Sequence, residues 1–131
     1  MAPNLMVGIV GEAAETVTEE NTADKFGNQG ARVFATPMMV ALMEQAAIAA
    51  VSGYLADDEG TVGTKVDVSH LAATPIGMTV RAVAKLVAIE GKKLVFEVEA
   101  WDEIDKIGEG RHERFVINTV KFYNKVEAKV K

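Results

Sequence analysis

The chain has 131 residues, of which 49% are hydrophobic, with a mean hydropathy of +0.11 and a formal net charge of -5 at pH 7. This length predicts a single domain over residues 1–131, with enough apolar side chains for a real core. The acidic balance argues against a nucleic-acid or anionic-membrane partner, because both require clustered Lys and Arg. The lack of cysteine excludes a disulfide framework, a thiolate nucleophile and a cysteine-based metal site.

The sequence shows neither a targeting signal nor a membrane span. Its N-terminus lacks a basic region and reaches Glu12 too soon for a secretory signal. No apolar run approaches membrane-spanning length. With no cysteine in the chain, these features favour a reducing compartment, and a cytoplasmic location is predicted.

The first third of the chain predicts a strand followed by a long loop. Residues 6–18 alternate apolar and polar side chains, which is typical of a strand. Residues 19–32 are rich in Glu, Asn, Thr, Asp, Gly and Gln, with Phe26 as the lone aromatic residue, and this composition predicts a loop. Long loops in compact domains are often lids or binding loops, so we expect this one to cover a site.

Residues 34–55 predict the helix around which the rest of the chain is arranged. Thr36 is expected to cap it, and Pro37 suits the first helical position. The helix is apolar on nearly every side, which predicts burial, and its alanines permit close approach to a sheet or another helix. Gly53 is expected at its C-cap. Its one charged residue, Glu44, needs a partner if it is buried.

From residue 61 onward the sequence alternates with a period of two, which predicts consecutive antiparallel strands. We expect these strands at residues 61–73, 78–89, 93–101 and 106–122. One strand, one buried helix and four more strands is an α+β plan in which a curved antiparallel sheet wraps the helix. Exposed sheet edges and a small-residue helix surface favour a symmetric dimer.

Glu44 and His70 are the first candidates for chemistry. The even positions of residues 61–73, with His70 among them, carry the valines and are expected to face the helix. Glu44 and His70 are therefore predicted to contact each other. Such a pair is a coupled acid–base unit that activates water or a nucleophile, or else it is a buried bond that only fixes the helix on the sheet.

Thr36 lies at the helix start, where backbone amides could stabilise an oxyanion, or where the residue is a simple cap. The eight residues from Thr36 to Glu44 rise about 12 Å at about 1.5 Å per residue, so the two cannot touch within one continuous helix. Three arrangements remain open. The chain folds back at Thr36, or His70 or water links the two residues, or a partner subunit supplies one of the set.

A second charged group is formed by His112, Glu113 and Arg114, for which a solvated strand end is the favoured interpretation. Gly108 and Gly110 share a side of the strand with Arg114 and would let another group approach the backbone. Two histidines far apart in sequence give no metal-ligand spacing, so no metal is expected. No phosphate-binding glycine loop or dinucleotide fingerprint is present, and no cofactor is predicted.

Three segments carry a resemblance to a known family: VFATPMMVALME at residues 33–44, GTVGTKVDVSHLAATPIG at residues 60–77 and IGEGRHER at residues 107–114. Between about residues 33 and 126 the sequence resembles the fluoroacetyl-CoA thioesterase family of the hot-dog superfamily. The resemblance implies a hot-dog fold and a homodimer or higher oligomer with active sites at the subunit interface. It also implies hydrolysis of a short-chain acyl-CoA thioester to free acid and CoA.

The family's catalytic Thr, Glu and His fall on Thr36, Glu44 and His70. Its glycine beside the acyl group falls on Gly63, and an arginine near the site falls on Arg114. Phe34 is added as a further candidate for substrate binding.

The fluoroacetate-specific member carries phenylalanines in the loop before the helix, where this sequence has Gly27 and Gly30. The resemblance therefore implies a general short-chain acyl-CoA substrate. The alternative is a non-catalytic hot-dog module that binds an acyl thioester or a small ligand. A hydratase or dehydratase on the same fold has only the histidine in its favour.

Overall fold

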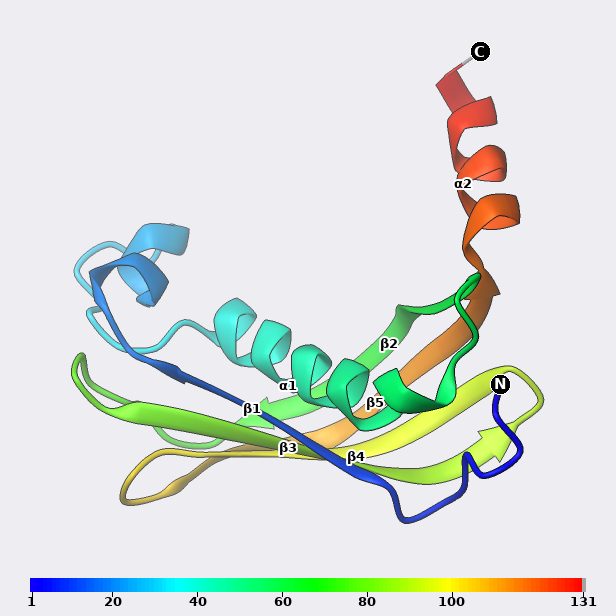
Figure 1. Ribbon diagram of the computed structural model, residues 1–131. Helices are drawn as coiled ribbons and strands as arrows, with labels where there is room; N and C mark the ends of the chain where they lie inside the picture. Colours follow the sequence, from blue (N-terminus) through cyan, green and yellow to red (C-terminus); the bar gives the residue numbers. More distant parts are fainter. Residues whose placement is uncertain (131) are drawn as a thin grey trace.

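The computed structural model describes residues 1–130, which form one five-stranded antiparallel sheet with a long helix on one face (Figure 1). The strands are β1 (Val10–Thr16), β2 (Glu59–His70), β3 (Thr79–Glu90), β4 (Lys93–Trp101) and β5 (Lys106–Asn118), in the order β1-β3-β4-β5-β2. The helices are α1 (Thr36–Val51) and α2 (Thr119–Glu127), with short 3-10 turns η1 (Glu19–Asn21), η2 (Ala23–Phe26), η3 (Ser52–Tyr54) and η4 (Ala128–Val130). The predicted α+β class, with an antiparallel sheet curled around a helix, is confirmed.

Close backbone contact holds α1 on the sheet. A Cβ added to Gly11 of β1 would lie 2.3 Å from the Ala46 carbonyl oxygen and 2.3 Å from the Ala50 nitrogen. The backbone of α1 therefore lies directly against Gly11, a close approach of the kind that the alanines of the helix were expected to permit. The buried side of α1 consists of Met39, Leu42, Met43, Ala46, Ala47, Ala50 and Val51.

The opposite side of α1 is not buried, so the prediction of a helix buried all round is wrong for a single chain. Ile48 is 45% exposed, and the Glu44 side chain is 36% exposed. Val40 and Ala41 on the same side are half-buried. An apolar helix face that its own chain leaves uncovered is the kind of surface that a second subunit covers.

Both ends of α1 differ from the prediction in detail. Ala35 occupies the N-cap position without a side-chain cap, and Thr36 is already helical, so its hydroxyl is available for another partner. At the other end, the C-cap residue is Ser52 in a right-handed conformation, so the expected glycine cap at Gly53 is wrong. The chain tightens there into the 3-10 turn η3.

A bulge in β2 decides which of its residues face α1. The strand pairs with β5 in register except at Thr64, where one extra residue is inserted. After the bulge the even positions, including His70, lie on the α1 side, as the alternation predicted. Before it the odd positions Thr61 and Gly63 lie on that side, because the extra residue reverses the alternation. The prediction that Val62 points to the core is therefore wrong.

The last predicted strand is too long, because β5 ends at Asn118 and the chain continues as α2. The Asn118 side chain accepts a hydrogen bond from the Lys121 amide at 3.0 Å and so caps this helix. The Thr119 amide donates to the Asp58 carbonyl at 2.9 Å, which ties the start of α2 to the start of β2. From there α2 stands away from the sheet on the same side as α1 (Figure 1).

The predicted loop over residues 19–32 is a folded flap that contains η1 and η2 and rises beyond the N-terminal end of α1 (Figure 1). It is tied down where Thr22 bridges to Phe34 and where the Ala35 amide donates to the Asn21 carbonyl at 2.9 Å. Within residues 1–130, no helix combines the length and apolarity needed to cross a membrane. The cytoplasmic location stays a prediction.

Candidate active site

The first residue of α1 and the last residue of β2 form a hydrogen-bonded pair. Thr36 Oγ1 lies 2.7 Å from His70 Nδ1. The other ring nitrogen, Nε2, is buried and has no hydrogen-bond partner among residues 1–130. Burial lowers the pKa of His70 below its ordinary 6.5, so the ring is neutral at pH 7. In either neutral tautomer Nε2 remains an unpaired buried polar atom, which is costly unless another group reaches it.

A hollow of about 360 Å³ opens beside this pair, between the flap and the end of β2. Its lining consists of Ala23, Asn28, Val33, Phe34, Thr36, His70, Leu71, Ala72 and Ala73. The volume is that of a small-molecule pocket, and the lining combines apolar side chains with polar groups such as those of Asn28, Thr36 and His70. Phe34, only 1% exposed, forms part of its wall, which is the position expected for a substrate-binding residue.

The first turn of α1 offers fewer backbone donors than a usual helix start. The amides of Met38 and Met39 both donate to the Ala35 carbonyl at 3.0 Å, and Pro37 has no N–H. Among residues 1–130 the amide of Thr36 has no acceptor, and it lies next to the threonine hydroxyl. A developing oxyanion could therefore receive one backbone hydrogen bond here.

Glu44 belongs to a second polar group, built on Arg114 of β5. Arg114 Nη1 donates to Glu44 Oε2 at 3.2 Å. The Nε and Nη2 of the same guanidinium donate to the hydroxyl and carbonyl oxygens of Thr61, each at 2.9 Å. Arg114 is 4% exposed, and burial lowers its pKa while the charge of Glu44 opposes that shift. A charge this deeply buried is stable only with such a full set of partners.

His112 completes this second group as a neutral residue. Its Nδ1 lies 2.8 Å from the Lys65 carbonyl and donates to it, which leaves Nε2 as the acceptor for Arg114 Nη1 at 3.2 Å. Burial lowers the pKa of His112, as does the charge of Arg114. The 3.9 Å separation between its Nε2 and Glu44 Oε2 is therefore not an ion pair. Since His112 is 1% exposed, the interpretation of this segment as a solvated strand end is wrong.

Gly63 provides the space that Glu44 occupies. A Cβ at this position would lie 2.7 Å from Glu44 Oε2, 3.2 Å from Arg114 Nη1 and 3.3 Å from His112 Cε1. Contacts of 2.7 Å are closer than real Cβ atoms show. The glycine thus leaves room for this packing, and its role beside the acyl group stays a prediction.

The predicted contact between Glu44 and His70 is not made within one chain. Glu44 lies beside Gly63, and Gly63 is seven residues from His70 on β2, a separation of about 23 Å at about 3.3 Å per residue. The structure brings Thr36 to His70 at the start of α1 and Glu44 to Arg114 at its middle. Thr61 was missed by the sequence reasoning, because the bulge that turns it inward has no signature in the alternation.

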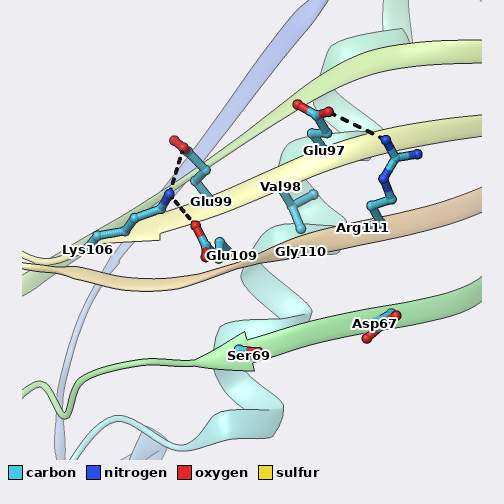
Figure 2. Close-up of a pocket in the computed structure, with 9 residues that line it drawn as sticks. All are labelled: Asp67, Ser69, Glu97, Val98, Glu99, Lys106, Glu109, Gly110 and Arg111. Carbon is cyan, nitrogen blue, oxygen red and sulfur yellow. Dashed lines mark hydrogen bonds and ion pairs between the residues drawn. The ribbon is translucent and has the colours of Figure 1, made fainter.

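Another hollow, of about 530 Å³, lies on the other face of the sheet (Figure 2). Figure 2 shows Lys106 held between Glu99 and Glu109, and Arg111 paired with Glu97, with α1 behind the sheet. Both bases are neutralised and the carboxylates outnumber them, so this groove repels anions. It contains neither Thr36 nor any other candidate residue. Among the described residues, no group of three His, Cys, Asp or Glu side chains could hold a metal ion.

Comparison with known proteins agrees with this architecture. A family model described as fluoroacetyl-CoA-specific thioesterase matches residues 17–120. The fluoroacetyl-CoA thioesterase of Streptantibioticus cattleyicolor is 50% identical over 97 residues, which are 74% of this chain and 70% of that protein.

A solved structure of the fluoroacetyl-CoA thioesterase FlK superposes with a TM-score of 0.89 at 40% identity and covers 96% of this chain and 98% of its own. A mutant of FlK in complex with acetyl-CoA superposes with a TM-score of 0.90 at 39% identity, over 97% and 100% of the two chains. A hot-dog-like protein from Thermanaerovibrio acidaminovorans, at 22% identity and a TM-score of 0.87 over 99% and 94% of the two chains, shares the fold.

The sheet curled around α1 is thus a hot-dog domain, and the chain is a thioesterase-type member of this superfamily. Within that class, the chain belongs to the fluoroacetyl-CoA-specific thioesterase family. The predicted family, fold and class of enzyme are confirmed.

Proposed function

We propose that the chain hydrolyses short-chain acyl-CoA thioesters to free acid and CoA, as a homodimer. In each site, Thr36 and His70 come from one subunit and the carboxylate comes from Glu44 of the partner subunit. The observation that carries the proposal is the unpaired, buried Nε2 of His70, within a pocket of suitable size at the start of α1.

Glu44 is suited to reach a second chain. All its contacts with residues 1–130 run through Oε2, and the side chain is 36% exposed. Arg114 orients the carboxylate without enclosing it. Oε1 can therefore accept a hydrogen bond from a protonated His70 Nε2 of another subunit, which would make that imidazole a stronger base.

The edge of the sheet supplies the geometry for such an exchange. β2 pairs only with β5, so its other edge has unpaired backbone groups over twelve residues. Antiparallel pairing of two copies about a twofold axis near the middle of β2 would make one continuous sheet. With the axis between Val66 and Asp67, it would set His70 of one strand opposite Gly63 of the other, with both α1 helices on the same side. The exposed apolar face of α1 would then also be covered.

The chemistry follows from these positions. The thioester carbonyl would lie at the start of α1, where the Thr36 amide stabilises the oxyanion. His70, charged in the transition state and stabilised by the carboxylate, would take the proton of the attacking group. Two nucleophiles fit this arrangement: a water held by Thr36, or Thr36 Oγ1 itself through an acyl-enzyme intermediate. A burst of thiol equal to the enzyme concentration in the first turnover identifies the second route.

The acyl group is proposed to be a short one without selectivity for fluorine. Gly27 and Gly30 have φ angles of +96° and +85°, a left-handed conformation that strains other residues. Phenylalanine at either position would require a different path for the flap, so this chain lacks the aromatic gate. Acetyl-CoA, the ligand in the mutant FlK complex, is the first substrate to test.

The test of activity is thiol release from acetyl-CoA and from longer acyl-CoAs, in the wild type and in His70→Ala. We expect turnover by the wild type and a loss of more than about a hundredfold in the variant. No thiol release above background from any chain length would reject hydrolysis and leave a non-catalytic acyl-thioester binding module.

Subunit complementation tests the shared site. Glu44→Ala and His70→Ala are each expected to be inactive, and each destroys a different half of the site. After co-refolding in equal amounts, half of the dimers are mixed and have one intact site, so about a quarter of the wild-type activity should return. Recovery of no activity from folded mixed dimers would show that the residues act within one chain or not at all.

A further inference from the structure

We propose that a row of three lysines, Lys121 and Lys125 on α2 and Lys129 on the turn η4 that follows it, binds the phosphate groups of the CoA substrate at the pocket of the partner subunit. This inference rests on the proposed function, since it needs a CoA thioester and a dimer. It adds a binding site for the nucleotide end of the substrate, about which the Thr36 pocket says nothing. Residues 121–129 lie beyond the segment that the family model matches, which ends at residue 120.

The phosphate groups of the CoA substrate need positively charged side chains, and several of those in this chain are already paired with carboxylates. CoA carries a diphosphate and a 3′-phosphate, whereas the protein has a net charge of -5. All four arginines, and Lys93 and Lys106 among the lysines of residues 1–130, are already in ion pairs with carboxylates. The flap beside the pocket carries Glu19, Glu20 and Asp24 against Lys25 and Arg32, so it does not attract an anion.

Lys25, Lys65, Lys85 and Lys92 are also in no ion pair within residues 1–130, but the lysines of α2 and η4 differ from them in their spacing. They recur every four residues and therefore form one row along the helix, about 12 Å long at about 1.5 Å per residue. None is in an ion pair within residues 1–130, and Glu127 is the single acid of the helix. A row of this kind is a continuous positive strip that can follow two separated phosphate groups.

The side chains next to the row add a place for the adenine ring. A hollow of about 340 Å³ is lined by Phe122, Lys125, Val126 and Lys129. An aromatic ring and an aliphatic side chain beside two ammonium groups match a nucleotide, because the base stacks on the apolar surface while its phosphates meet the charges. The hollow thus offers an apolar surface for the adenine ring and ammonium groups for the phosphates.

Within one chain α2 is on the wrong end of the sheet for this role. It starts beside Glu59, and β2 extends about 36 Å from Glu59 to His70 at about 3.3 Å per residue. Antiparallel pairing of two β2 edges reduces this separation to about 13 Å at about 3.3 Å per residue, because His70 opposite Gly63 of the partner subunit leaves the partner's Glu59 four residues further along. Figure 1 shows α2 rising on the same side of the sheet as α1 and the flap. The partner's α2 would therefore stand at the mouth of the pocket.

The experiment compares a double variant with a charge-matched control. Lys125→Ala/Lys129→Ala removes two positive charges from the row, while Arg81→Ala/Lys85→Ala removes two from β3, away from the pocket. Each protein is assayed with acetyl-CoA, with its 3′-dephospho analogue and with acetyl-pantetheine, which has neither phosphate group. Binding of CoA and of pantetheine is measured by calorimetry, which does not depend on turnover.

For the α2 variant we expect the KM for acetyl-CoA to rise about three- to tenfold with kcat unchanged, since each exposed charge contact contributes modestly. The rise should be smaller for the dephospho analogue and absent for acetyl-pantetheine, and raising the salt concentration should abolish the difference between variant and wild type. The control should match the wild type with all three substrates.

An equal effect on acetyl-CoA and acetyl-pantetheine would overturn the proposal, because α2 would then act on the pocket and not on phosphate. An unchanged KM for acetyl-CoA would also overturn it. If the wild type hydrolyses none of these thioesters, the proposed function fails. The calorimetric affinities for CoA then still decide whether the α2 lysines bind phosphate.

Discussion

The Gly63→Ala substitution tests the polar group around Glu44 with the addition of one methyl group. The new Cβ would lie 2.7 Å from Glu44 Oε2, about 0.7 Å inside an ordinary contact of 3.4 Å. The half-exposed carboxylate can yield more readily than the buried Arg114 can. A retreat of this size from Arg114 stretches their 3.2 Å hydrogen bond beyond bonding distance.

The cost follows from the bond that is lost. A charge-assisted hydrogen bond contributes about 1.5–3 kcal/mol, and the exposure of Glu44 reduces this to about 1–2 kcal/mol of unfolding free energy. For a chain of this length the loss corresponds to a Tm lower by about 3–8 °C. If Glu44 serves a partner's active site, kcat/KM should also fall by about a hundredfold, because catalysis is sensitive to displacements near 1 Å.

The assay is thermal unfolding together with thiol release, and Gly60→Ala is the matched control on the same strand. A Cβ at Gly60 would meet only Thr119 Cγ2 at 3.4 Å, so this variant should stay within about 0.5 kcal/mol of the wild type. If Gly63→Ala changes neither Tm nor kcat/KM, the carboxylate is not held where the structure places it, and the reasoning about Glu44 is refuted.

Three further outcomes are expected. Gly11→Ala should lower the unfolding free energy, measured by urea titration, by about 3 kcal/mol or more. The new Cβ would clash with the backbone of α1 at Ala46, and no rotamer change can relieve that clash. A loss below about 1 kcal/mol would contradict this contact. Burial lowers the pKa of both His70 and His112 below 6.5, so the unfolded state takes up protons first as the pH falls. The unfolding free energy should therefore decrease as the pH falls through and below 6.5. Equal urea midpoints at about pH 7.5 and pH 5.5 would argue against buried neutral rings. Asn118→Ala removes the cap of α2 and should cost about 1 kcal/mol of stability, seen as faster amide exchange confined to α2; protection that is unchanged would show that the cap is not needed.

Much of the architecture could be predicted from local patterns in the sequence. The sequence periodicity changes from helical to strand-like near residue 61, and it shows which face of each element is apolar. An apolar face must be buried in any fold, so this part of the architecture does not depend on the tertiary structure. The alanines of α1 likewise indicated that the helix lies close to a neighbouring element. The segment around Thr36 and the one around His70 carried the candidate residues because their chemistry is visible in the residue types.

The relation between these candidates was decided by the tertiary structure. Whether Glu44 meets His70, or meets Arg114, depends on the register of β2 with β5 and on one inserted residue at Thr64, neither of which a pattern of apolar residues records. The same register buries His112 beside Arg114 in a segment whose charges suggested solvent. Sequence periodicity states which side of an element faces inward, but only the pairing of strands fixes the distance along the element, and the chemistry of this site depends on that distance.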